Sequence, residues 1–243
     1  MSRSSAFVRF PCALVALAAS CLIRAAAAEP AMATTPVRGI VLDRLSSAEL
    51  RTWQSIERVC YTRRGGAPRY PTLAGLLDWA RGSENPIYIE LSSADCALSS
   101  IAGRFFIERF DPHATRHVGV IRLCLANIDR VGATGGDRRA NGLVRFAGLR
   151  GTKRYAEVLG HELAHAASDF ASPERARLVW DRVDRVSAEF ASHRALHGNE
   201  PLDPALKRRL EERDALLVDL EADADAVELL VWRELVKAGG ARR

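Results

Sequence analysis

The sequence HELAH, from His161 to His165, constrains this chain more than any other stretch. Two histidines four residues apart lie on one face of a helix, at the spacing with which two imidazoles bind a single metal ion. In H-E-x-x-H helices the glutamate, here Glu162, is the general base that takes a proton from metal-bound water. Gly160 is unfavourable in a helix and indicates that another element packs closely there. The neighbouring side chains are uncharged, as a buried helix needs: Val158, Leu159, Leu163, Ala164, Ala166 and Ala167.

The alternative interpretation of this stretch is an ordinary core helix whose histidines are satisfied without a metal. Glu162 is a charged residue in an otherwise apolar run, which is costly to bury unless something pairs with it. The context of the motif favours a metal site that holds one zinc ion per chain.

On these residues the chain resembles the zincin metallopeptidases. The resemblance implies an α+β, zincin-like fold, in which a small N-terminal sheet precedes the HExxH helix and a C-terminal helix carries the third ligand. It also implies a zinc-dependent hydrolase that cleaves peptide bonds in a peptide or protein substrate. We expect a single domain of this kind over residues 46–243.

The third ligand is expected on the last predicted helix, whose centre reads DLEADADAVELL over residues 219–230. Gluzincins, to which this arrangement is similar, place a ligand on such a helix. Four residues later they carry a carboxylate that orients the first histidine. Two registers fit this pattern: Glu221 with Asp225, or Asp219 with Asp223.

Helix geometry favours the second register. At about 100° per residue, Glu221 and Asp225 share an acidic stripe that is typical of a solvated face, together with Asp214 and Glu228. Asp219 and Asp223 fall among small and apolar residues, where a buried carboxylate needs a partner such as a metal or a ligand histidine. We therefore predict Asp219 as the third zinc ligand and Asp223 as the orienting carboxylate, with Glu221 as the alternative ligand.

A second resemblance selects the same register. Gluzincins of the prenyl-protein-protease and heat-shock-protease types carry a pattern like E-x-x-A-(D/N)-x-x-A-x-x-L. Asp219 stands where that pattern has glutamate, and four other positions match it: Ala222, Asp223, Ala226 and Leu229. The shorter aspartate favours the alternative function, a non-catalytic zincin-like binding or structural protein of the cell envelope.

The N-terminus has the pattern of a secretory signal peptide over residues 1–28. Arg3 and Arg9 precede an apolar stretch over residues 12–23, and small residues stand at the expected cleavage site. A lipid anchor at Cys21 is the alternative. We expect an exported protein, periplasmic or extracellular, with a flexible lead-in over residues 29–45.

Three cysteines remain in the mature chain, namely Cys60, Cys96 and Cys124. An oxidising compartment allows one disulfide and leaves one thiol, and the sequence does not choose the pair. No second long apolar run follows the signal, so no transmembrane span is expected in the mature chain. Removing three signal-peptide arginines lowers the formal net charge from +5 to +2, which gives no reason to expect a nucleic-acid partner. The oligomeric state stays open.

The remaining pattern predicts helices over residues 46–59, from residue 72, over 173–196 and from 204 to about 239. Strands are predicted over residues 87–91, 105–110 and 118–128, and a loop over 132–153. By the resemblance to zincins, we expect the strand around residues 121–125 to form the sheet edge that aligns an extended peptide.

Overall fold

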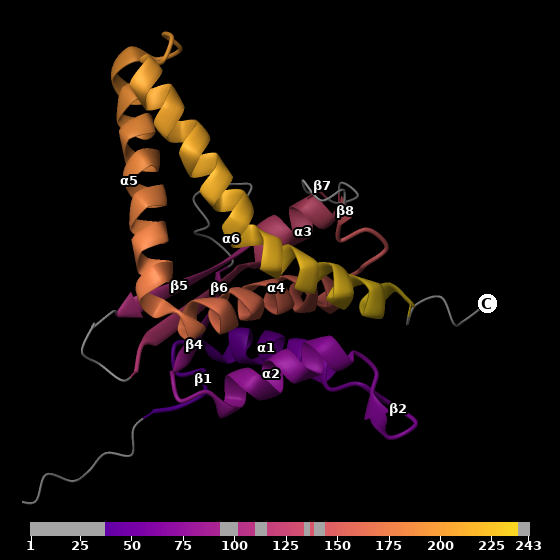
Figure 1. Cartoon of the computed structure of the whole chain (residues 1–243). Helices are drawn as coiled ribbons and strands as arrows, with labels where there is room; N and C mark the ends of the chain where they lie inside the picture. Colours follow the sequence, from indigo (N-terminus) through magenta and orange to yellow (C-terminus); the bar gives the residue numbers. More distant parts are fainter. Residues whose placement is uncertain (1–36, 93–101, 110–115, 134–136, 139–143, 238–243) are drawn as a thin grey trace, which may run out of the picture. The chain divides into compact units, whose positions relative to one another are not determined.

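The helix that carries HELAH, α4 (Thr152–Ala171), is the centre of the fold, because every residue from 156 to 166 is buried. It belongs to one compact unit, Pro36–Arg243, seen in a computed structural model. The structure describes residues 37–92, 102–109, 116–133, 137–138 and 144–237. The fold is mixed α+β, and α4 lies between the sheet with its covering helices and a long C-terminal helix (Figure 1).

The sheet has the strand order β1 (Ile40–Val41), β4 (Ile87–Ser92), β6 (Val118–Cys124) and β5 (Gly103–Arg109). The first three strands are parallel, and β5 pairs antiparallel with β6. Because side chains alternate across a strand, one face carries apolar residues toward α4. Three cross-strand neighbours of that face are fully or almost fully buried: Ile89, Ile121 and Phe105.

Shorter elements surround this core. Helices α1 (Ser47–Cys60) and α2 (Pro71–Gly82) pack against α4, and α3 (Leu125–Ala133) follows β6 directly. A capping box between Ser46 and Glu49 starts α1. Two small hairpins complete the described elements: β2 (Arg63–Arg64) with β3 (Ala67–Pro68), and β7 (Asp137–Arg138) with β8 (Val144–Arg145).

The last helix, α6 (Pro204–Lys237), packs along α4 with its C-terminal half. Two polar contacts fix that end of the helix. The Thr72 backbone N–H and hydroxyl donate to the Glu234 carboxylate, which thereby caps the start of α2 from another helix. The Lys153 ammonium donates to the Leu235 carbonyl at 2.7 Å. These contacts position the acidic centre of α6 opposite α4.

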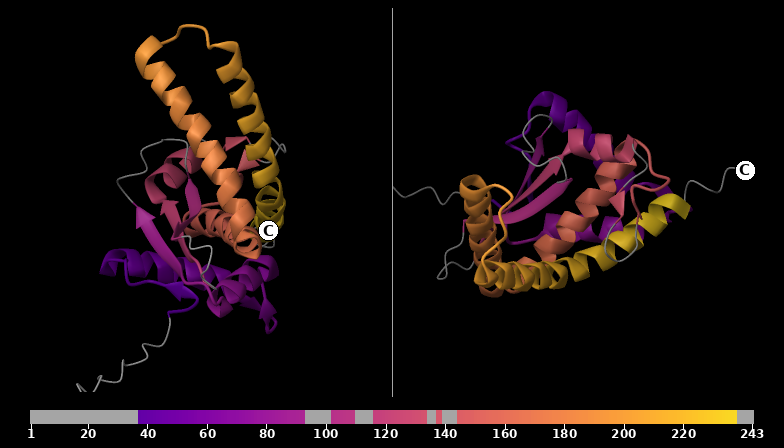
Figure 2. Two further views of the ribbon diagram at one scale, coloured as in Figure 1. Left: turned by 60° about the vertical axis from the view of Figure 1, so that its left-hand side comes forward. Right: turned by 90° about the horizontal axis from the view of Figure 1, so that it is seen from above.

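The N-terminal half of α6 forms an antiparallel hairpin with α5 (Pro173–His197), as both views show (Figure 1, Figure 2). Its direction is evident from the ion pairs Arg182–Glu212 and Arg209–Glu189. A small second core lies inside this hairpin and is formed by Val186, Leu206 and Leu210 with Phe190 and Leu202. The hairpin therefore has its own apolar contacts besides those at α4.

The predicted helices and most strand positions are confirmed. Asp203 caps the start of α6, since its carboxylate accepts from the N–H groups of Ala205 and Leu206. The third predicted strand is wrong after Cys124, where the chain turns into α3. The predicted flexible lead-in over residues 29–45 is wrong at Ile40 and Val41, which pair with β4. The predicted signal peptide and Cys21 lie outside the described residues.

Cys124 is disulfide-bonded, and its partner lies outside the described residues. Cys60 is a free thiol in the core, and burial raises its pKa to about 12. None of the helices in the described part of the chain is long and apolar enough to span a membrane.

Candidate metal centre

The two histidines of the HELAH sequence lie on one buried face of α4. His161 and His165 expose only 3% and 7% of their surface, and their Nε2 atoms are 3.1 Å apart. The predicted close packing at Gly160 is confirmed, because a Cβ atom there would lie 3.2 Å from Val231 of α6 and 3.3 Å from Leu73 of α2. α4 and α6 are thus in close contact next to His161.

The carboxylate that meets the two histidines belongs to Glu221 of α6. One of its oxygens is 3.1 Å from His161 Nε2, and the other is 3.6 Å from His165 Nε2. Two imidazole nitrogens and one carboxylate therefore converge on one point from two helices. This set is the one that tetrahedral zinc sites with an open position use.

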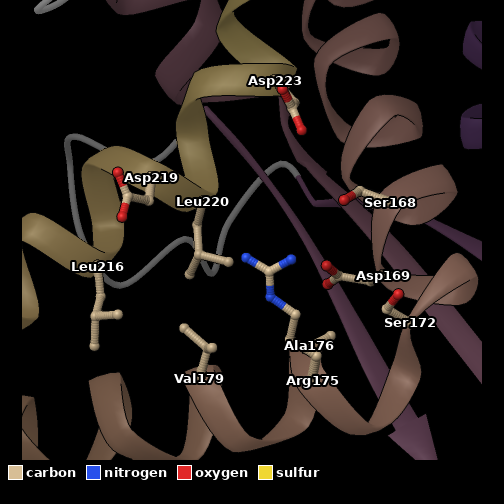
Figure 3. A pocket seen from close by; sticks show the side chains of 10 residues that line it. All are labelled: Ser168, Asp169, Ser172, Arg175, Ala176, Val179, Leu216, Asp219, Leu220 and Asp223. Atoms are coloured by element: carbon tan, nitrogen blue, oxygen red, sulfur yellow. The ribbon is translucent and has the colours of Figure 1, made fainter.

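The structure places Asp219 and Asp223 elsewhere, so the predicted register is wrong. Both residues are exposed and line a cavity of about 150 Å³ between α6, α5 and the end of α4 (Figure 3). The guanidinium group of Arg175 points into this cavity from α5 (Figure 3). Neither aspartate belongs to the group of side chains that converges at the histidines.

The second nitrogen of His161 also faces a carboxylate. Its Nδ1 atom is 3.1 Å from Oε2 of Glu228, which has no exposed surface, and 3.9 Å from Oδ1 of Asp225. A carboxylate at the far nitrogen of a metal-binding imidazole fixes its tautomer and its orientation. Glu228 and Asp225 therefore take the place that Asp223 was predicted to hold.

The helical-stripe argument failed because it identified the wrong face of α6 as solvated. That argument placed Asp219 and Asp223 among small and apolar neighbours, and three of these neighbours are exposed, namely Ala222, Ala226 and Leu230. The acidic stripe instead continues into buried apolar positions on the same face, at Val231 and Leu235. That continuation, spaced three and seven residues after Glu228, was the signal available in the sequence.

In this cluster the acidic residues favour the protonated form of His161, and the histidines favour the ionised form of Glu221. Burial lowers the pKa of His161, but hydrogen bonds to Glu221 and Glu228 outweigh burial and raise this pKa to about 9. Burial raises the pKa of Glu221, but the hydrogen bonds to His161 and His165 hold it well below its usual range. Without a metal, a proton on His161 therefore neutralises part of the buried negative charge.

Glu162 lies on α4 between the two histidines and is 3% exposed. It faces β5, because a Cβ atom added at Gly103 would lie 2.8 Å from its Oε1 atom. The expectation that β6 is the sheet edge is wrong, since β6 pairs with β4 on one side and with β5 on the other. β5 is the outermost described strand on this side of the sheet.

A groove of about 330 Å³ runs along β5. Its walls are the strand residues 104–107 and one face of α5, which presents Arg177, Trp180, Asp181 and Asp184. The indole N–H of Trp180 donates to the Asp169 carboxylate at 3.1 Å, and Asp169 stands one turn after His165 in α4. This hydrogen bond therefore joins one wall of the groove to α4, the helix that carries the histidines.

The donor set fits a metal ion. His161, His165 and Glu221 offer two nitrogens and a carboxylate oxygen that all lie within 4.8 Å of one another. A second group, formed by His161 with Asp225 and Glu228, uses the opposite imidazole nitrogen and so orients the same histidine. No family model matches the chain, and no curated protein or solved structure is significantly similar to it.

Proposed function

We propose that this protein is an exported zinc-dependent peptidase. The observation that carries the proposal is the convergence of His161 Nε2, His165 Nε2 and the Glu221 carboxylate beside the buried Glu162. A purely structural site needs no unligated carboxylate next to its ligands, whereas hydrolysis needs a base there.

Each residue of the cluster has a distinct role in this proposal. His161, His165 and Glu221 would hold the zinc ion, and Glu228 would keep the His161 imidazole in its ligating orientation. Zinc bound there supplies Lewis acidity, which polarises a peptide carbonyl and acidifies water. Glu162 accepts the proton of the attacking water and delivers it to the leaving amine.

The groove beside β5 supports a peptide as the substrate. An extended peptide can add a strand to an exposed sheet edge, where main-chain hydrogen bonds hold it without regard to sequence. The β5 edge begins at Gly103, beside Glu162, and continues along the groove to Ile107. A strand bound there would pass the proposed general base, Glu162.

Export is supported by the signal-like N-terminal sequence and agrees with a disulfide at Cys124, since disulfides persist in oxidising compartments. The alternative, a non-catalytic zincin-like protein, drew its support from an aspartate at the third ligand position. That support is lost, because the residue that faces the histidines is Glu221.

The deciding experiment compares the mature protein with Glu162→Gln for zinc content and for hydrolysis of a peptide library. Glutamine keeps the shape of glutamate but cannot accept the proton. We expect about one zinc per chain in both proteins and a loss of hydrolysis by roughly 100-fold or more in the variant. Wild-type hydrolysis by Glu162→Gln would refute the mechanism, and a zinc-loaded wild type without any hydrolysis would favour the structural alternative.

A further inference from the structure

Gly103 is the first residue of β5 and lies on the face of the sheet that packs against α4. Phe105, two residues later on the same face, is buried and stacks edge-on against Phe170 of α4, with ring centroids 5.5 Å apart. At Gly103 the corresponding space holds α4 side chains instead. A Cβ atom there would lie 2.6 Å from Val158 Cγ1, 2.8 Å from Glu162 Oε1 and 3.0 Å from Glu162 Cγ.

We propose that Gly103 is a positioning residue for Glu162, and that its missing side chain provides the space in which the general base lies. Contacts under 3.0 Å are not tolerated by a real Cβ atom, so any side chain at residue 103 must displace Glu162, Val158 or both. Glu162 has little free space into which it could move, because it is only 3% exposed. Moving Oε1 of Glu162 from 2.8 Å to ordinary van der Waals contact at about 3.4 Å is a shift of roughly 0.6 Å, and catalytic groups need placement to within about 0.5 Å.

The backbone at residue 103 does not itself require glycine. Gly103 is not among the residues with positive φ, so alanine is compatible with its backbone conformation. The cost of Gly103→Ala therefore comes from the contact with α4 and not from strand geometry. This separation makes the alanine variant a specific probe of the Gly103–Glu162 relationship.

The first test measures how strongly residues 103 and 162 are coupled in the stability of the metal-free mature chain. Gly103→Ala should raise the unfolding equilibrium constant much less in a Glu162→Ala background than in wild type, with a coupling of roughly fivefold or more. Gly119→Ala is the matched control. It also adds a Cβ on the inner face of the sheet, but it meets Phe105 and Phe170 at 2.7 Å and not Glu162. Its cost should be the same in both backgrounds, and equal costs for Gly103→Ala would overturn the proposal.

The second test separates positioning from packing and rests on the proposed peptidase function. Zinc-loaded Gly103→Ala should keep its zinc and its KM but lose about 10–100-fold in kcat, as expected for a misplaced base. Gly103→Ala with Val158→Ala removes the other contact, so this double variant should fold and still show the loss. An unchanged kcat in an active, folded variant overturns the positioning role while the peptidase function stands. A wild-type protein that hydrolyses no peptide would overturn both the peptidase function and the catalytic role of Gly103.

Discussion

Nδ1 of His161 lies 3.1 Å from Oε2 of Glu228, a carboxylate with no exposed surface. The other nitrogen of the same imidazole, Nε2, faces Glu221. Each ring nitrogen therefore faces a different glutamate of α6. Seven residues separate these two glutamates, which is about two helical turns. A single helix therefore supplies both the carboxylate that would bind the metal and the carboxylate that orients its histidine.

Glu228→Gln should weaken zinc binding without abolishing it. The change keeps the side-chain shape but removes the charge that holds His161 in its ligating tautomer, so we expect about a 10–100-fold lower zinc affinity. Asp225→Asn is the matched comparison and should cost less, because Asp225 is 3.9 Å from the same nitrogen. Competition with a chromophoric chelator measures both affinities. Equal losses for the two variants would show that the distance difference has no consequence.

Glu221→Ala should reduce zinc affinity more than Glu228→Gln does, because it removes a ligand and leaves two imidazoles. The loss should therefore exceed the roughly 10–100-fold that an orienting partner costs. Asp219→Ala is the control on the same helix, since Asp219 is exposed and faces the cavity beside α5. Metal content after dialysis reports both variants, and zinc lost from Asp219→Ala but kept by Glu221→Ala would reverse the assignment.

The sequence predicted the histidine pair because its spacing is a local property of one helix. It preferred Asp219 to the alternative Glu221 on α6, because the choice between them depends on which face of α6 meets α4. The buried Val231 and Leu235 determine this face. The acidic residues that precede them on the same face made it look solvated in the sequence. The sheet edge was mispredicted for a similar reason. β5 precedes β6 in the sequence but lies outside it in the sheet, and strand order is not a local property.

The metal-free protein should lose stability as the pH rises from about 6.5 to about 9. The pKa of His161 is raised in the folded state to about 9, so its contribution is complete below the unfolded value of 6.5. It disappears as the proton leaves, which corresponds to a loss on the order of 1–3 kcal/mol. Urea unfolding of chelator-treated protein at pH 6 and pH 9.5 measures this difference.

Glu228→Gln is the control for this pH dependence, because it removes one of the two hydrogen-bonded carboxylates that raise the pKa of His161. The stability loss between the two pH values should be smaller in that variant. Zinc should act in the opposite direction, since it competes with the proton for the imidazole and stabilises more at higher pH. A metal-free wild type that is more stable at pH 9.5 than at pH 6 would contradict this account.

Gly160→Leu should weaken zinc binding although Gly160 is not a ligand. A Cβ atom at this position already approaches Val231 to 3.2 Å and Leu73 to 3.3 Å, so a larger side chain must push α6 away from α4. Because Glu221 is on α6 and the histidines are on α4, this separation pulls the ligand set apart. Overpacking should also lower the free energy of unfolding by about 1–3 kcal/mol.

Gly75→Leu in α2 is the matched control, since an added Cβ there meets no atom within 4 Å. That control should keep its zinc affinity and gain up to about 1 kcal/mol from helix propensity. Chelator competition and urea unfolding test both variants, and wild-type zinc affinity in Gly160→Leu would show that the close contact of α4 with α6 does not set the geometry of the site.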